Sequence, residues 1–228
     1  MKRRFLLLVG ISLSSCSLFA QYSSSSQFRG GIQINGLQYP SSVGNYGMSF
    51  GPGIDFAYAP DNSRFEYAFN GSYYLPSASI TTGYVYNSDM SSEAEATLTQ
   101  KTSTIALGAG GRYFFMDRED HDLLPYATVS ATLVLANTTS SWARVPQGYA
   151  PYYGDQTSGK SAQWMVNFGA GIEYVVGAYG GGAVFAEANY RFPTGTYNSR
   201  TGYSEDVQIP AHPWFSFGYR FSIGGGGW

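Results

Sequence analysis

The sequence predicts an all-β protein that folds as an eight-stranded, antiparallel, up-and-down β-barrel. Apolar and polar residues alternate with a period of two along eight segments, which is the pattern of strands with one apolar and one polar face. The connections between these segments alternate between short and long, which is typical of a barrel with short turns at one end and long loops at the other. The chain of 228 residues is long enough for one such domain.

The clearest alternation lies in the last expected strand. There the apolar face consists of Phe215, Phe217, Tyr219, Phe221 and Ile223. The eight strands are expected at about 28–39, 48–59, 64–75, 102–115, 125–143, 164–174, 184–192 and 215–223. Short turns are expected near 60–63, 116–124 and 177–181, and long loops near 40–47, 76–100, 144–163 and 193–213.

Residues 1–20 have the features of a secretory signal peptide. Three positive residues, 2–4, precede a short apolar core at 5–13, and cleavage is expected between Ala20 and Gln21. A second interpretation stays open, because residues 13–16 resemble a bacterial lipobox in which Cys16 would be lipidated. In both cases the mature domain, 21–228, is exported, and the single cysteine of the whole chain, Cys16, excludes a disulfide framework.

The composition excludes several other classes of protein. The isoelectric point of about 5.6 and the lack of a basic run after residue 4 argue against a nucleic-acid-binding protein. Abundant aromatic residues, 17% of the chain, and a net charge of −2 argue against disorder. The mean hydropathy of −0.18 is too low for a helical membrane protein. Strands of about 9–11 residues can nevertheless cross a bilayer at a tilt.

Alternation alone does not decide which face points inward, and a soluble lipocalin-like carrier would place its apolar face inside. The opposite arrangement is favoured because the apolar face is rich in Tyr and Phe, as the aromatic girdles of a membrane barrel require. The polar face carries many glycines, and small residues suit the crowded lumen of an eight-stranded barrel. These glycines are Gly31, Gly51, Gly53, Gly108, Gly110, Gly169, Gly171 and Gly218.

The few charged residues of the strands also fall on the polar face. We expect them to form a nearly neutral network in the lumen, because a water-poor lumen requires charges to pair, and their expected role is stability. The expected members are Arg29, Asp55, Arg64, Glu66, Arg112, Glu173, Glu187, Arg191 and Arg220.

The last strand carries a resemblance to a known family. Residues 216–223 are similar to the C-terminal assembly signal of bacterial outer-membrane proteins, with Ser216, Gly218, Phe221 and Ile223 at its defining positions. The mature chain resembles the small barrels of the OmpA-barrel, OmpX and opacity-protein group. The resemblance implies a place in the outer membrane of a Gram-negative bacterium. It also implies contact with outer-membrane lipid and lipopolysaccharide, with the assembly machinery and with periplasmic chaperones. One departure is the Gly-rich tail at 224–228, which follows the last strand.

Two further motifs have simpler interpretations. Residues 154–161 match the phosphate-binding pattern G-x-x-x-x-G-K-[ST], but an alternating strand rather than a helix follows them, so a chance match is expected. The acidic segment 117–122 could hold Ca²⁺ through its carboxylates, yet its spacing differs from an EF-hand loop and a solvated turn is expected. No cofactor and no metal site is therefore expected.

The long loops are rich in Tyr, Ser, Gly and Asn, a composition that suits adaptable binding surfaces. The expected function is accordingly structural, or surface recognition of an adhesion-like kind through these loops, without catalysis. Three alternatives stay open: a narrow passive pore, a lipid-modifying enzyme and a soluble carrier. The enzyme would use one of the two histidines, His121 and His212. His212 has Ser204, Glu205 and Ser216 near it in the sequence.

Overall fold

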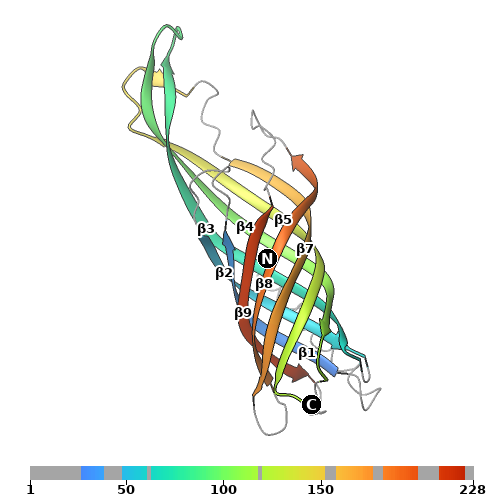
Figure 1. The fold of residues 1–228 in the computed structure, drawn as a ribbon. Helices are drawn as coiled ribbons and strands as arrows, with labels where there is room; N and C mark the ends of the chain where they lie inside the picture. The colour runs from blue at the N-terminus through green and yellow to red at the C-terminus, as the bar shows by residue number, and fades with distance from the viewer. Residues whose placement is uncertain are drawn as a thin grey trace, which may run out of the picture.

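The computed structural model describes residues 27–38, 48–60, 63–117, 120–151, 158–176, 182–199 and 211–223. Its strands are β1 (Gln27–Gln38), β2 (Met48–Ala59), β3 (Phe65–Asn87), β4 (Glu93–Phe114), β5 (Leu123–Ala143), β6 (Tyr149–Ala150), β7 (Ser158–Val176), β8 (Gly182–Ser199) and β9 (His212–Ile223). Figure 1 shows these strands wound around one axis. In this part of the chain no helix is both long and apolar enough to span a membrane.

Eight of the strands close into a barrel in which every neighbouring pair is antiparallel. The first and last strands complete the ring, because β1 pairs with β9 from Phe28 opposite Ile223 to Leu37 opposite Trp214. The two-residue strand β6 is not part of the ring and pairs with the far end of β3. The predicted eight-stranded antiparallel barrel is therefore confirmed.

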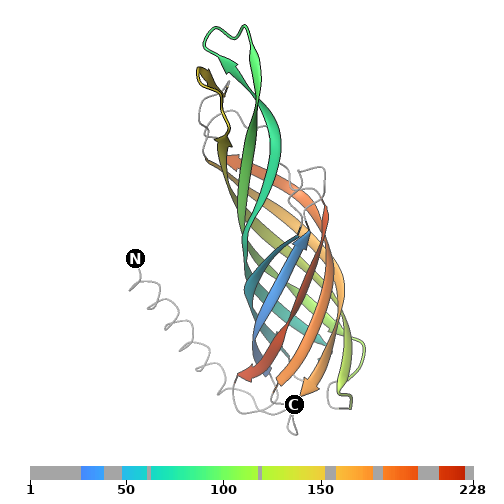
Figure 2. The same cartoon turned by 90° about the vertical axis from the view of Figure 1, so that its left-hand side faces the viewer.

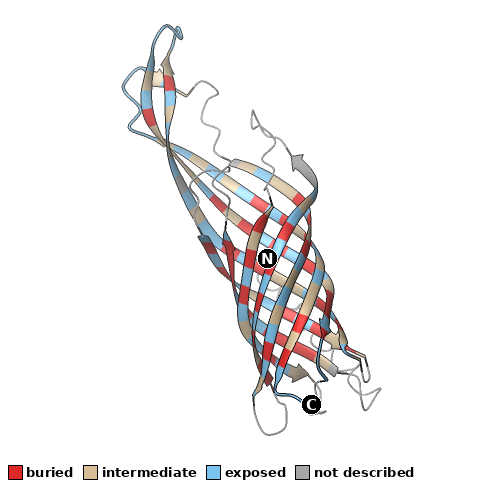
Figure 3. Ribbon diagram, in the orientation of Figure 1, coloured by how far each residue is buried: buried red, intermediate tan, exposed pale blue. Residues whose placement is uncertain are grey.

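Buried and exposed residues alternate along the strands (Figure 3). In β9, Phe217 is 59% exposed on the outside, whereas Ser216 and Arg220 are buried on the inside. The same pattern holds in β7, where Phe168 is exposed and Asn167 is buried. The apolar face therefore points outward, as the sequence predicted and as a membrane requires. A soluble barrel would have the reverse arrangement.

The outward apolar surface has the height of a membrane. Along β4 it begins at Ile105 and continues through Tyr113 to Phe115 beyond the strand end, all of them exposed. This distance is about 34 Å along the strand, or about 24 Å along the barrel axis at a tilt of roughly 45°. On the hairpin side of Ile105 the outward residues of β4 are Ser103 and Lys101, so the apolar surface ends there.

The prediction of a long loop at 76–100 is wrong, because β3 and β4 continue through these residues as a hairpin. The ladder runs from Ser77 opposite Thr102 to Tyr86 opposite Glu93. The turn is closed by hydrogen bonds from the Met90 amide to the Asn87 carbonyl and from the Asn87 amide to the Ser92 carbonyl. Figure 2 shows this hairpin extending well beyond the barrel. Outside the membrane neither strand face has to be apolar, so the alternation that marks the other strands is missing here.

The other expected connections are partly described. The loops expected at 144–163 and 193–213 are shorter than predicted, because β7 already begins at Ser158 and β8 extends to Ser199. The strand ends that flank the turns near 60–63 and 116–124 lie at the barrel end opposite the hairpin. The signal peptide with Cys16, the whole loop at 40–47, the turn at 177–181 and the tail at 224–228 lie outside the described residues.

Candidate functional site: the charged lumen

Seven charged side chains from seven strands meet inside the barrel, in the half nearer the short turns. They are three arginines and four acidic residues, Arg29, Arg112 and Arg220 with Asp55, Glu66, Glu173 and Glu187. Each is at most 8% exposed. They point inward because each falls on the same phase of the alternation as the small residues of its strand.

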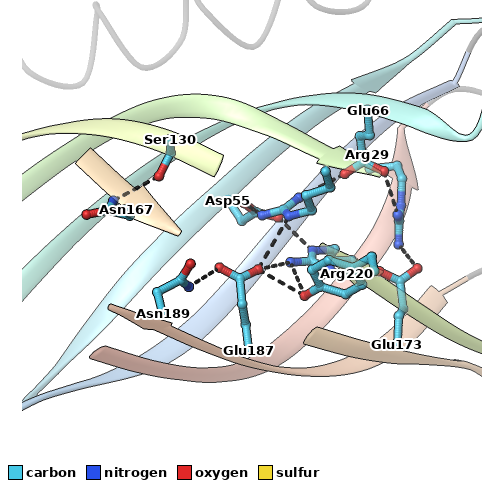
Figure 4. Close-up of polar contacts among 11 residues, drawn as sticks. Arg29, Asp55, Glu66, Ser130, Asn167, Glu173, Glu187, Asn189 and Arg220 are labelled. Carbon is cyan, nitrogen blue, oxygen red and sulfur yellow. Dashed lines mark hydrogen bonds and ion pairs between the residues drawn. The ribbon is translucent and has the colours of Figure 1, made fainter. Parts of the chain in front are cut away.

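Six of these side chains form a closed ring in which arginines and carboxylates alternate (Figure 4). Arg220 binds Asp55 through Nε at 2.7 Å and Glu173 through Nη1 at 2.7 Å. Arg112 joins Asp55 at 2.6 Å to Glu66 at 2.8 Å. Arg29 closes the ring, with Nη1 2.9 Å from Glu66 and Nη2 bonded to Glu173. Each carboxylate in the ring therefore bridges two guanidinium groups.

Glu187 attaches to the ring from one side. Its Oε2 lies 3.5 Å from Nε of Arg112 and 3.8 Å from Nη2 of Arg220. It accepts hydrogen bonds from the Tyr126 hydroxyl at 2.9 Å and from Asn189 Nδ2 at 2.7 Å. The fourth carboxylate is thus held by two neutral donors in addition to the arginines.

Uncharged residues that the sequence analysis missed complete the cluster. The Arg220 guanidinium lies 3.5 Å from the ring centre of Phe185 and 5.6 Å from that of Tyr126, which are cation–π contacts. A signal for both was present in the sequence. Tyr126 and Phe185 lie out of phase with the apolar residues of their strands, and therefore on the inward face.

Arg64 does not belong to the cluster, so its predicted place in the lumen is corrected. It lies one residue before β3, at the rim, where the alternation no longer places a side chain inside. Its Nη2 forms an ion pair with Oδ2 of Asp117 at 2.6 Å, and both side chains are about half exposed, 44% and 52%. This hydrogen-bonded arginine lowers the pKa of the Asp117 carboxyl.

Arg191 is inside the lumen but away from the ring. Its guanidinium lies 4.5 Å from the ring centre of Trp214, and within the described structure its Nε and Nη1 have no hydrogen-bond partner. Trp214 belongs to a buried apolar cluster in the hairpin half of the lumen, formed by Leu37, Tyr74, Ala106, Val134, Ala136, Met165 and Trp214. The structure therefore separates Arg191 from the carboxylates with which the sequence analysis grouped it.

Packed side chains occupy the lumen on both sides of the ring. Toward the short turns, Phe114, Leu124 and Tyr126 form a second apolar cluster with Val175. Toward the hairpin, Nδ2 of Asn167 donates hydrogen bonds to the hydroxyl groups of Thr132 at 2.6 Å and Ser130 at 2.8 Å. The apolar cluster around Trp214 lies beyond these residues. The charged groups thus lie between apolar layers and bind one another, an arrangement that suits rigidity.

The other candidate residues are spread over the molecule. His212 and Ser216 both point into the lumen from β9, four residues apart and hence about 13 Å along the strand, too far for direct proton transfer. His121 is exposed at the rim, whereas Ser204 and Glu205 lie outside the described residues. Gly159, Lys160 and Ser161 of the phosphate-loop pattern lie within β7 rather than before a helix. Among the described residues no three His, Cys, Asp or Glu side chains are grouped as metal ligands.

The expected assembly signal lies on β9, which pairs with β1 on one side and β8 on the other. Ser216 points inward and Phe221 outward, and Ile223 lies opposite Phe28 at the rim. Gly218 is required by close packing, because a Cβ there would lie 2.3 Å from the carbonyl oxygen of Ile32. The residues of the signal therefore belong to the strand that closes the barrel.

The comparisons with known proteins rest on structure. No family model and no curated protein matches the sequence. The Neisserial surface protein A has a similar structure, with a TM-score of 0.51 and 13% identity over 87% of this chain and 97% of that one. A major outer membrane protein from Thermus thermophilus matches with a TM-score of 0.50 and 8% identity over 86% and 99%. With its closed ring of eight strands and its outward apolar surface, the chain has the fold of these small outer-membrane β-barrels.

Proposed function

We propose that the chain is an integral protein of the bacterial outer membrane. In this proposal it does not conduct, and it acts at the cell surface by recognising an extracellular ligand through the β3–β4 hairpin. The observation that carries the proposal is the hairpin itself, which extends the sheet beyond the apolar surface (Figure 2). Short turns of such barrels face the periplasm, so the hairpin at the opposite end faces the outside.

The edge of the hairpin supports a role in recognition. From Ser77 to Val85, β3 pairs with β4 on one side and with none of the described strands on the other. An unpaired edge offers amide and carbonyl groups to an extended segment of another chain. Just beyond this stretch, Tyr86 and Asn87 pair with β6, so the same edge already accepts a second segment within the molecule.

The filled lumen supports the absence of conduction. Eight strands leave an interior just wide enough for side chains to fill. The ion-pair ring of Arg29, Arg112 and Arg220 crosses it, and the cluster around Trp214 follows toward the hairpin. An ion would have to break several buried ion pairs to pass.

The test shortens the hairpin without touching the barrel. Residues 81–98 are replaced by an Asn-Gly turn that joins Ile80 directly to Thr99, two residues that lie opposite each other. Cells that display the wild type should adhere to epithelial monolayers and to immobilised matrix proteins, and cells with the shortened variant should not. Heat-modifiable gel mobility from the membrane fraction verifies that both barrels are folded. Equal adhesion of the two would contradict a role of the hairpin.

Two further measurements separate the alternatives. Stable conductance in planar bilayers that Arg220→Ala or Glu66→Ala alters would instead support a narrow pore. A change in the mass of lipid A on expression, abolished by His212→Ala, would support a lipid-modifying enzyme. We expect neither result.

A further inference from the structure

Arg191 is a buried cation without a counterion in the described part of the chain. It lies on β8 inside the lumen and is 1% exposed. None of the ion pairs between described residues includes it. The nearest acidic residue along β8 is Glu187, four residues and about 13 Å away along the strand, and it lies beside Arg112 and Arg220. A buried charge without a partner is unfavourable, so an anion beside Arg191 would stabilise the fold.

Hydrogen-bond donors without acceptors lie around this guanidinium. Nε and Nη1 of Arg191 and Nε1 of Trp214 are buried and have no partner within the described structure. The guanidinium carbon lies 4.5 Å from the centre of the Trp214 ring, so these N–H groups belong to one small region. The Tyr74 hydroxyl lies near Arg191, Trp214 and Ser72, but it forms no hydrogen bond of acceptable geometry with them. Three kinds of donor, charged N–H, indole N–H and O–H, are therefore available to one acceptor.

The side chains that surround this region offer no carboxylate. The neighbouring strands place the amide of Asn167 and the imidazole of His212 opposite Arg191. The other members of the cluster around Trp214 that lie closest to the strand ends, Leu37 and Met165, are apolar and buried. Buried donors of this kind are normally satisfied, and an unsatisfied one costs its full desolvation energy. An acceptor that is not part of the described chain would satisfy them.

We propose that Arg191, Trp214 and Tyr74 bind one monovalent anion of halide size, such as chloride, inside the lumen. A halide accepts hydrogen bonds from N–H and O–H donors in many directions, and it carries the single negative charge that Arg191 lacks. It is one atom and therefore needs little space in a lumen that side chains fill. The inference goes beyond the proposed surface recognition and does not depend on the hairpin.

Two other occupants fit the region less well. A buried water molecule would satisfy some of the donors, but it would leave the charge of Arg191 without a counterion. Sulfate or phosphate is larger and brings a second negative charge, for which the region has no second cation. The distinction between water and a halide is therefore one of charge, and it can be measured.

The site binds an anion without passing it through the barrel. It lies in the hairpin half of the lumen, with the cluster around Trp214. Toward the short turns the lumen is crossed by the ion-pair ring of Arg29, Arg112 and Arg220. The anion accordingly has a structural role, which is to neutralise Arg191, and the proposed absence of conduction is retained.

The direct test is crystallography of the purified full chain in sodium bromide. An anomalous peak of bromide is expected within hydrogen-bonding distance of the Arg191 guanidinium and of Nε1 of Trp214. Crystals of Arg191→Met should lack this peak. A wild-type lumen that holds only water at this place, or an acidic side chain bonded to Arg191 there, would overturn the proposal.

The second test is urea unfolding in lipid vesicles at constant ionic strength, with chloride exchanged for gluconate, which is too large for the site. Above the dissociation constant, a tenfold rise in chloride should raise the ratio of folded to unfolded wild type about tenfold, or about 1.4 kcal/mol, because one anion binds only the folded state. Arg191→Met should show no such dependence on chloride. Trp214→Phe and Tyr74→Phe each remove one donor and keep the ring, so each should require about tenfold more chloride for the same stabilisation.

Arg64→Met is the matched control, because Arg64 is an arginine at the exposed rim, outside this site. Its stability should depend on chloride as strongly as that of the wild type. Heat-modifiable gel mobility verifies first that every variant is folded. Equal dependence on chloride in the wild type and in Arg191→Met would assign the effect to anions elsewhere on the protein or membrane and would overturn the proposal, as would no dependence in either.

Discussion

Arg220 and Asp55 form an ion pair across Gly31, with 2.7 Å between Nε and Oδ2. Gly31 of β1 lies opposite Asp55 of β2 and also opposite Arg220 of β9. Its hydrogen side chain leaves the space above β1 in which the two groups meet, because a Cβ at Gly31 would already contact both side chains at 3.2–3.3 Å. The pair therefore joins the strands on either side of the barrel closure.

Replacement of Arg220 should strongly destabilise the folded barrel. Arg220→Met leaves Asp55 and Glu173 buried with one guanidinium partner fewer each, and such a loss costs about 3–5 kcal/mol of unfolding free energy. Urea unfolding in lipid vesicles, followed by tryptophan fluorescence, measures the change.

Arg64→Met is the control for this prediction, since the ion pair of Arg64 with Asp117 lies at the exposed rim. Exposed ion pairs contribute little to stability, so its unfolding midpoint should stay near that of the wild type. Equal effects of the two variants would mean that the buried ring does not stabilise the barrel.

Arg191 should respond differently from Arg220, although both side chains are buried. Arg191→Met removes a guanidinium that contacts Trp214 and, within the described structure, no carboxylate, so it leaves no buried anion behind. Loss of the cation–π contact destabilises the barrel, whereas removal of a buried charge stabilises it. The two effects offset each other, and in gluconate buffer we expect the free energy of unfolding to change by about 1 kcal/mol or less in either direction. The same urea titration checks it, and a loss as large as that of Arg220→Met would reveal a carboxylate partner for Arg191.

The sequence was sufficient to predict the strands of the barrel wall because the two faces of the wall have different surroundings. Lipid outside and a packed lumen inside force a strict alternation, so Phe217 and Arg220 could be assigned to opposite faces without a structure. The hairpin beyond the membrane has no such constraint. Its β-branched and aromatic residues at 80–86, followed by the turn residues 87–89, were the available signals for a strand and a turn.

The members of the lumen network were predictable only in part, since seven of the nine expected residues meet in the cluster and Arg64 and Arg191 do not. Alternation places Arg64, Arg112 and Arg191 on the same face, yet it contains no information on height along the barrel axis. Height separates Arg64 at the rim and Arg191 near Trp214 from Arg112 in the ring. Register between distant strands, such as Gly31 opposite both Asp55 and Arg220, decides which charges meet, and it follows from the whole closed sheet.

The pair at the rim makes a prediction about pH. The hydrogen bonds from Arg64 favour the ionised form of Asp117 and lower the pKa of its carboxyl. Because this pKa is depressed in the folded state, the stabilisation is present above the ordinary aspartate pKa and is lost as the pH falls through the lowered value. An NMR titration of the Asp117 carboxyl carbon should show this low pKa, and Arg64→Gln should raise it toward the ordinary value. An identical titration curve in the variant would contradict the pairing.

Gly171 should be intolerant of even a methyl group because the ring of Tyr126 covers it. A Cβ at position 171 would lie 2.3 Å from Cζ of Tyr126, on the neighbouring strand and next to the ion-pair ring. Overpacking of this kind costs about 1–3 kcal/mol, so Gly171→Ala should lower the urea midpoint. Gly159→Ala on the same strand is the matched control, since its Cβ would meet no atom of the described residues within 4 Å, and its midpoint should not change. In a Tyr126→Leu background the effect of Gly171→Ala should largely disappear, because the clashing ring is gone. An equal loss in both backgrounds would assign the requirement for glycine to the backbone instead of to Tyr126.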